Sequence, residues 1–261
     1  MDTEDTMEIK IGTSGYSFDD WKGTFYPPDI QKGKMFDHYV KYFNTVEINS
    51  TYYRIPHPAV MANIEKKSPD GFEFIVKAPD TVTHKRKNIE RAVRDFDECL
   101  KPMVEPGKLK GILAQFPYSF KFNQANIDYL KYCRELLEKY PLFVEFRHNS
   151  WVNRAMYDEF IAAGIGYVAV DEPPLSGLLA PDFFNTTDTA YIRLHGRNSE
   201  HWWQGGALRY DYDYSREELE QWKDKIKKRE EKIKKLYIFF NNCHLGQAVK
   251  NAQEMIKALE L

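Results

Sequence analysis

Short apolar runs alternate with amphipathic segments along the whole of this chain. Each run has the length and the β-branched or aromatic content typical of a buried strand, and between most runs the apolar residues recur with helical spacing. We predict strands over 9–13, 45–49, 72–78, 111–116, 142–147, 166–171, 190–195 and 236–241. We predict helices over 34–43, 58–67, 88–101, 123–139, 153–163, 215–235 and 247–259.

Eight strands with intervening helices predict an α/β protein, an irregular TIM (β/α)8-type barrel. The stretch after the sixth strand, EPPLSGLLAPDFFNTTDT, is rich in proline and turn residues and has no helical period, so we expect the sixth helix to be reduced or absent. A doubly wound open sheet is the rival architecture, but no glycine-rich phosphate-binding sequence follows the first strand. We predict one domain over 9–261 after a flexible tail over 1–8.

The charge balance limits the classes of partner. The 261 residues include 37 Lys and Arg against 39 Asp and Glu, a net charge of −2, which excludes a polybasic protein that coats nucleic acid or membrane by bulk charge. The beginning, MDTEDTMEIK, is acidic, and no apolar run approaches the roughly 18 residues of a membrane span. Three distant cysteines without a C-x-x-C pair do not suggest disulfides. We expect a cytoplasmic protein with no membrane partner.

Polar residues interrupt several strands near their carboxyl ends. In 142–147, Leu142, Val144 and Phe146 alternate with Glu145 and Arg147, and strands 45–49 and 190–195 alternate in the same way. Because the apolar set packs on the helices, the polar set points into the barrel, at the end where TIM barrels build their active sites. The residues predicted to meet there are Glu47, Asn49, Lys77, Gln115, Glu145, Arg147, Asp171, Arg193, His195 and Asn241.

This polar cluster has two interpretations. Buried ion pairs are often no more stabilising than apolar packing, so we interpret the cluster as a site, with a structural ion-pair network as the alternative. The predicted catalytic residues are Glu47 and Glu145 as candidate general bases and His195 as their acid/base partner. Arg147 next to Glu145 would lower the pKa of that carboxyl, which favours Glu47, but sequence alone leaves both open.

The loops above this end of the barrel are aromatic and basic. Aromatic rings beside cations suit stacking on bases or sugars, with the cations for phosphate, although rings of this kind also pack loops down. The loop residues that we predict to bind a ligand are Tyr52, His84, Trp151 and Arg197.

We predict no cofactor. Glu47, Glu145, Asp171 and His195 are ligand types for a divalent metal, which is the alternative. However, no motif with metal-ligand spacing supports it, and the three interleaved cations would repel the ion.

Several strings of the chain, in order and across about its whole length, match one family. They are GTSGYSFDDWKGTFYP, EINSTYYRIP, FIVKAPDTVTH, AQFPYSF, VEFRHNSW, VAVDEP, YIRLHGRN and YIFFNNCHLGQAVKNA. The chain thereby resembles the YecE-like proteins, domain-of-unknown-function family 72. The resemblance implies an irregular TIM barrel related in shape to xylose isomerase and endonuclease IV. It implies no reaction, and it suggests nucleic-acid binding only by analogy.

We therefore expect a pocket at the carboxyl ends of the strands that binds or acts on a phosphorylated sugar or a nucleic-acid-like ligand by acid/base chemistry. The alternative is a non-catalytic nucleic-acid-binding protein resembling endonuclease IV-type barrels. Whether the protein is an enzyme is left open at this stage.

Overall fold

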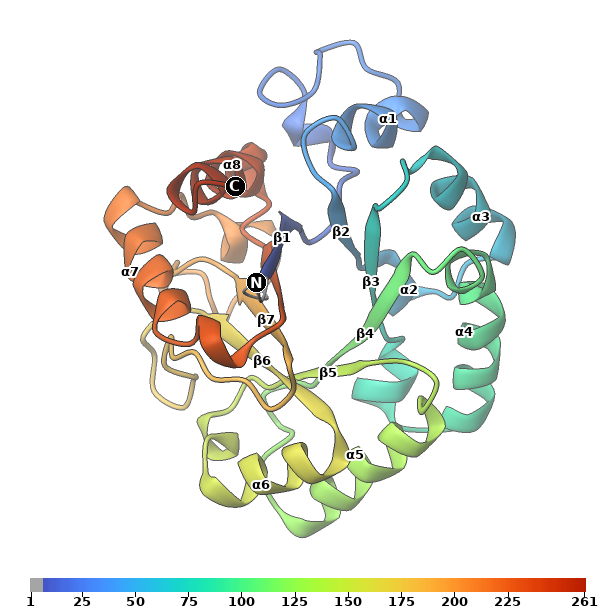
Figure 1. Ribbon diagram of the computed structural model, residues 1–261, viewed down its shortest axis with the longest axis vertical. Coiled ribbons are helices and arrows are strands. Elements are labelled where there is room, and N and C mark those ends of the chain that lie inside the picture. The colour runs from blue at the N-terminus through green and yellow to red at the C-terminus, as the bar shows by residue number, and fades with distance from the viewer. Residues whose placement is uncertain (1–6) are drawn as a thin grey trace, which may run out of the picture.

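A computed structural model describes residues 7–261 and contains a barrel of eight parallel strands with helices around it (Figure 1). The hydrogen-bonded order is β1-β8-β7-β6-β5-β4-β3-β2. All eight predicted strands are present, which confirms the TIM-like fold class. The strands are β1 (Glu8–Thr13), β2 (Thr45–Ile48), β3 (Glu73–Lys77), β4 (Leu109–Gln115), β5 (Leu142–Glu145), β6 (Ile165–Asp171), β7 (Thr189–Leu194) and β8 (Lys235–Phe240).

The barrel closes between its first two strands through a narrow contact. Ser14 and Glu47 form an isolated parallel bridge, and the backbone N–H of Gly15 donates to the carbonyl oxygen of Glu47 at 2.8 Å. A side chain at Gly12 would place its Cβ 2.4 Å from the carbonyl oxygen of Thr45, so only glycine allows the strands to approach this closely. The closure lies beside Glu47, one of the predicted site residues.

Seven helices correspond to the predicted ones, and their bounds differ mainly at the ends. They are α1 (Met35–Tyr39), α3 (Pro58–Lys67), α4 (Ile89–Val104), α5 (Gln124–Leu136), α6 (Arg154–Ala163), α7 (Arg216–Lys227) and α8 (Gln247–Ala258). A short helix, α2 (Ser50–Tyr53), was not predicted. The connection from β6 to β7, residues 172–188, contains no helix, as predicted.

Several predicted boundaries were wrong, among them the end of the helix predicted over 34–43, which stops at Tyr39. The helix predicted over 215–235 ends at Lys227, and a short 3-10 turn, Glu230–Lys232, follows. Ile233 is buried there because the chain must already turn inward to begin β8. The predicted tail over 1–8 lies mostly outside the described residues, and Glu8 belongs to β1.

Side chains fill the lower part of the barrel interior. Phe143 of β5 lies against Gly111 and Gly166, where an added Cβ would come within 2.5 Å of its ring. Nearer the amino ends of the strands, Tyr237 donates to Glu73 at 2.6 Å and Lys235 binds the same carboxylate at 2.7 Å. The interior is therefore packed in its middle and lower layers, so the carboxyl ends of the strands are where space for a ligand remains. Among residues 7–261, no helix is both long and apolar enough to cross a membrane.

Candidate functional site

Arg193 of β7 lies at the centre of a buried ionic network. Its Nε and Nη2 donate to the two carboxylate oxygens of Glu47, at 2.9 and 2.7 Å, and its Nη1 donates to Glu145 at 2.5 Å. All three side chains are fully or almost fully buried. Burial by itself would lower the pKa of Arg193, but the charges of Glu145 and Glu47 raise it above its ordinary value. Arg193 is thus a permanent cation shared by two carboxylates.

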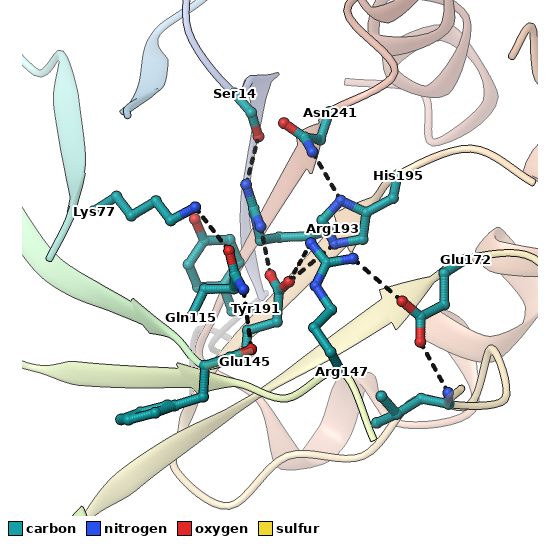
Figure 2. Close-up of polar contacts among 12 residues, drawn as sticks. Ser14, Lys77, Gln115, Glu145, Arg147, Glu172, Tyr191, Arg193, His195 and Asn241 are labelled. Atoms are coloured by element: carbon teal, nitrogen blue, oxygen red, sulfur yellow. Dashed lines mark hydrogen bonds and ion pairs between the residues drawn. The ribbon is translucent and has the colours of Figure 1, made fainter. Parts of the chain in front are cut away.

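Glu145 of β5 also lies close to a second guanidinium and to an imidazole. Its Oε1 lies 2.8 Å from Nη2 of Arg147 and 3.2 Å from Nε2 of His195 (Figure 2). Burial would raise the pKa of Glu145, but the charges of Arg147 and Arg193 outweigh burial and hold that pKa well below its ordinary value. Glu145 therefore stays ionised and is a poor general base.

His195 lies beside Glu145 as a neutral ring. Its Nδ1 lies 2.9 Å from the amide nitrogen of Asn241, a donor, so the ring proton is on Nε2, which faces Glu145. Burial, together with the charge of Arg147, lowers the pKa of His195 to about 3. The imidazole is fully buried, which separates it from any ligand.

Arg147 also binds a carboxyl group that the sequence analysis did not identify. Its Nη1 donates to Glu172 at 3.2 Å, and the other oxygen of Glu172 accepts the backbone N–H of Leu179 at 2.9 Å. Burial raises the pKa of Glu172 to about 7, and the charge of Arg147 opposes that rise. Glu172 connects the helix-free segment 172–188 to the site.

Lys77, at the end of β3, pairs with no carboxylate of residues 7–261. Its Nζ donates to Oε1 of Gln115 at 2.8 Å and lies 4.5 Å from the centre of the Tyr52 ring. The amide group of Gln115 also donates to the carbonyl oxygen of Phe116 at 3.0 Å, so its oxygen is left to face Lys77. Burial, with the charge of Arg193, lowers the pKa of Lys77 to about 7. The short helix α2 holds Tyr52 in place, because Thr51 donates to the carbonyl oxygen of Lys77 at 2.6 Å.

A cavity of two adjoining compartments opens above the network. The inner compartment has a volume of about 450 Å³ and includes Ser14, Tyr16, Asn49 and Arg193 in its lining. The outer compartment has a volume of about 300 Å³ and is lined in part by aromatic and basic residues of the loops. Six residues line both compartments: Tyr52, Tyr53, Lys77, Gln115, Arg147 and Tyr210.

The structure brings most of the predicted site residues together. The predicted residues that line the cavity are Asn49, Tyr52, Lys77, His84, Gln115, Arg147, Arg193 and Asn241. The predicted catalytic residues Glu47, Glu145 and His195 belong to the same network but lie behind that lining, fully buried. In the described part of the chain, neither compartment has an aspartate or glutamate in its lining.

Three predicted residues lie outside the cavity. Asp171 points to the helix layer, where Arg197 binds both of its oxygens at 2.7 Å and the indole N–H of Trp222 donates at 2.6 Å. The predicted inward orientation of Asp171 was therefore wrong, and Arg197 is occupied with it and with Glu218 of α7. Trp151 is also buried in the helix layer, stacked on Phe146 with ring centres 4.0 Å apart.

Three further residues of the network were not predicted. Tyr191 donates to Glu47, Ser14 accepts from Arg193 at 3.4 Å, and Glu172 binds Arg147. Tyr191 lies two residues before Arg193, so the alternation that indicated Arg193 could also have indicated Tyr191. Glu172 lies two residues after Val170, so it points to the same side of the strand as Val170. It was not predicted because Asp171 had been assigned to the inner face instead.

Metal ligation has no support in the described residues. Across 7–261, no group of three or more His, Cys, Asp or Glu side chains is arranged to hold a metal ion. Two of the carboxylates considered for that role, Glu47 and Glu145, are each bound by guanidinium groups instead.

Relatives of known structure have the same fold over almost the whole chain. The crystal structure of the DUF72 family protein TM1631 from Thermotoga maritima is 41% identical, with a TM-score of 0.90 over 97% of this chain and 100% of that one. The DUF72 family protein EF0366 from Enterococcus faecalis is 25% identical, with a TM-score of 0.85 over 98% of both chains.

The sequence comparisons agree with this result. The protein YunF of Bacillus subtilis, described as a UPF0759 protein, is 31% identical over 97% of this chain and 95% of its own length. The model of the family described as "Protein of unknown function DUF72" matches residues 10–261. The chain therefore belongs to the DUF72 family.

Proposed function

We propose that the cavity binds a phosphorylated ligand of the size of a sugar phosphate or a nucleotide and that the protein acts on it by acid/base chemistry. The combined geometry of Lys77, Arg147 and Arg193 carries this proposal. These three cations line one cavity whose described lining contains no carboxylate. With no carboxylate oxygen in that described lining, the N–H groups that face the cavity can bind the oxygens of an anion, and the cavity volume falls in the range of small-molecule sites.

The placement of the carboxylates favours an anion further. Glu47 and Glu145 lie beneath Arg193 and Arg147 and fix the two guanidinium groups from behind. Arg147 keeps N–H groups that neither Glu145 nor Glu172 binds, and a fixed guanidinium of this kind suits the oxygens of a phosphate. In this arrangement Glu47, Glu145 and His195 are positioning residues.

The groups that can transfer protons to a ligand are those that face the cavity. Lys77 has a pKa of about 7, so it can accept and donate a proton near neutral pH. His84 lines the outer compartment, and burial, together with the charge of Lys77, lowers its pKa to about 4. A neutral His84 beside Lys77 completes an acid/base pair.

Calorimetric titration tests the proposal. Ribose 5-phosphate and adenosine monophosphate should bind, and ribose and adenosine should bind at least about tenfold more weakly, because the phosphate contact is lost. Lys77→Met and Arg147→Met should abolish the preference for the phosphorylated ligands. Lys227→Met, at an exposed position of α7, is the matched control and should retain it. Equal affinity for ribose and its phosphate would exclude an anion site.

Exposed rings at the rim favour the alternative, a non-catalytic protein that binds single-stranded nucleic acid. Tyr53 is 80% exposed and Trp203 is 54% exposed, and both line the cavity mouth. Bases stack on rings of this kind. An oligonucleotide that binds much more tightly than a mononucleotide, with an affinity that falls steeply with salt, would favour the alternative.

A cytoplasmic location is part of the proposal. Cys99, Cys133 and Cys243 are free and buried, which suits a reducing compartment. Cell fractionation followed by detection of the protein tests it, and recovery with an extracytoplasmic fraction would contradict it.

A further inference from the structure

Lys77 differs from the other cations of the site in what surrounds it. It is the one lysine in the described lining of both compartments. Its Nζ contacts the amide oxygen of Gln115, whereas Arg147 binds the two carboxylates Glu145 and Glu172 (Figure 2). The Nζ also faces the Tyr52 ring, and Arg193 likewise binds two carboxylates, Glu47 and Glu145. No carboxylate of residues 7–261 lies within ion-pair distance of Lys77, so no ion pair there holds the ammonium form, and its direct contacts are with a neutral amide and an aromatic ring.

The charged groups around Lys77 come from four elements or loops. Arg193 of β7 and Arg147 after β5 disfavour its ammonium form, and Glu145 of β5 and Glu47 of β2 favour it. The two glutamates already bind the two arginines, so their effect on Lys77 is largely cancelled. Burial is then the main influence on the pKa of Lys77, and it favours the neutral amine.

A neutral amine in an anion site is a nucleophile. At pH 7 a lysine of ordinary pKa 10.5 is unprotonated in only about one molecule in three thousand, whereas at a pKa of about 7 half of the molecules carry a free lone pair. The amine also lies where both compartments meet, next to Arg147, which can hold the phosphate of a substrate.

We propose that Lys77 forms an imine with the carbonyl carbon of a phosphorylated aldehyde or ketone, such as a sugar phosphate in its open form. This inference rests on the proposed anion site and names the reacting group and the substrate class. It makes Lys77 a catalytic residue and Gln115, which holds its Nζ, a positioning residue.

The step balances without another reactant. The lone pair of Nζ attacks the carbonyl carbon, and one Nζ proton passes to the carbonyl oxygen to give a neutral carbinolamine. The hydroxyl then takes up a proton and leaves as water, and the remaining N–H proton is released to the medium, which leaves a C=N bond. One amine and one carbonyl give one imine and one water, with no change of oxidation state. His84, in the same compartment, is the imidazole available to carry these protons.

Pyridoxal 5′-phosphate is a suitable probe, because it combines an aldehyde, an aromatic ring and a phosphate. The whole protein is treated at pH 7 with the probe, reduced with borohydride and digested, and the labelled lysines are identified by peptide mass. Lys77 should be labelled at least about tenfold faster than Lys227, because its neutral fraction is so much larger. Labelling of Lys77 at the same rate as Lys227 overturns the proposal.

Two comparisons separate the imine from the anion site. Pyridoxal, which lacks the phosphate, should label Lys77 more slowly, and inorganic phosphate should protect Lys77 from pyridoxal 5′-phosphate. If pyridoxal labels Lys77 equally fast and phosphate does not protect Lys77 from labelling, Lys77 is a nucleophile but the cavity is not an anion site. If the probe binds in competition with phosphate but leaves Lys77 unlabelled, the cavity is an anion site but Lys77 is not a nucleophile.

Lys77→Arg provides the matched variant. It keeps a positive charge at the site and removes the nucleophile, so the label should disappear from that tryptic region. Lys227→Arg should leave the labelling of Lys77 unchanged. Circular dichroism and thermal unfolding of both variants check that the fold is retained.

Discussion

Arg193 and Glu47 face each other across the interior of the barrel and form a two-point ion pair. Arg193 lies on β7 and Glu47 on β2, strands that are not neighbours in the sheet, and the two contacts measure 2.9 and 2.7 Å. The pair therefore links opposite walls of the barrel. It also presents the guanidinium of Arg193 to the cavity, where that side chain forms part of the lining.

Removal of Arg193 should strongly destabilise the fold. Arg193→Met leaves Glu47 buried with only the neutral groups of Tyr191 and Asn49, and such a loss costs about 3–5 kcal/mol. Urea unfolding at pH 7 measures the change. The double variant Arg193→Met/Glu47→Gln should recover part of the loss, because the unpaired charge is removed as well. Arg154→Met, which breaks an exposed pair with Asp158, is the control and should cost less than about 1 kcal/mol. A cost equal to that of the control would contradict the prediction.

Glu172 should make the protein less stable as the pH rises. Burial raises its folded pKa to about 7 from an ordinary 4.5, so between these values the folded state binds more protons than the unfolded state. The free energy of unfolding of the wild type, relative to Glu172→Gln, should fall by about 3 kcal/mol between pH 4.5 and 7 and then level off. Urea unfolding at several pH values tests this. A difference that does not change with pH would mean that Arg147 keeps Glu172 ionised throughout.

His195 should have the opposite effect on the acid side. Its folded pKa of about 3 lies below the ordinary 6.5, so the unfolded state takes up a proton first as the pH falls. Relative to His195→Gln, the wild type should lose roughly 1.4 kcal/mol of stability per pH unit between about 6.5 and 3. The same urea series measures it. An unchanged difference over that range would show that the imidazole is protonated in the folded state.

Phe143 should be incompatible with any side chain at Gly111. In Gly111→Ala the added Cβ would lie 2.5 Å from the Phe143 ring, and overpacking of this kind costs about 1–3 kcal/mol. The smaller side chain of Phe143→Leu should cost less in the Gly111→Ala background than alone, which a double-mutant cycle of unfolding free energies measures. Gly71→Ala is a poor control because Gly71 has a φ of +75°. Gly33→Ala, with no atom near its Cβ and an ordinary φ, is a better one. Additive costs at 111 and 143 would contradict the contact.

The sequence indicated the fold because its signals are local. Strand and helix periods alternate regularly, and the proline-rich stretch after β6 cannot continue a helical pattern. The end of α7 was missed because its charged residues continue at helical spacing to Lys235. What ends the helix is the position of β8, a tertiary constraint that helix propensity does not contain.

The site was predictable only where a strand is polar on one face. In β5 and β7 the alternation of apolar and charged residues fixed the orientation, and Glu145 and Arg193 point inward as expected. In β6 both faces are apolar up to Val170, so the sequence contained no signal for which of Asp171 and Glu172 points into the barrel. The roles of Glu47 and Glu145 also depend on which cations they bind, and those contacts are formed across the barrel.

Gln115→Glu should convert Lys77 from an amine into a paired ammonium. The change places a carboxylate oxygen where the amide oxygen now accepts from Nζ at 2.8 Å, and an opposite charge at such a distance moves a pKa by about 1–3 units. The midpoint of the pH–rate profile for labelling of Lys77 by pyridoxal 5′-phosphate should therefore rise, and the rate at pH 7 should fall about fivefold or more. Gln115→Met removes the acceptor without adding a charge and should leave the midpoint near 7 or lower it, because the amine then loses its one polar contact. Two results would contradict this prediction: an equal upward shift of the midpoint in both variants, or no shift in either. Each would mean that the amide of Gln115 is not the reason why Lys77 has no counter-charge. If only the glutamate variant raises the midpoint, the neutral character of the Lys77 site follows from an amide standing where a carboxylate would otherwise pair with it.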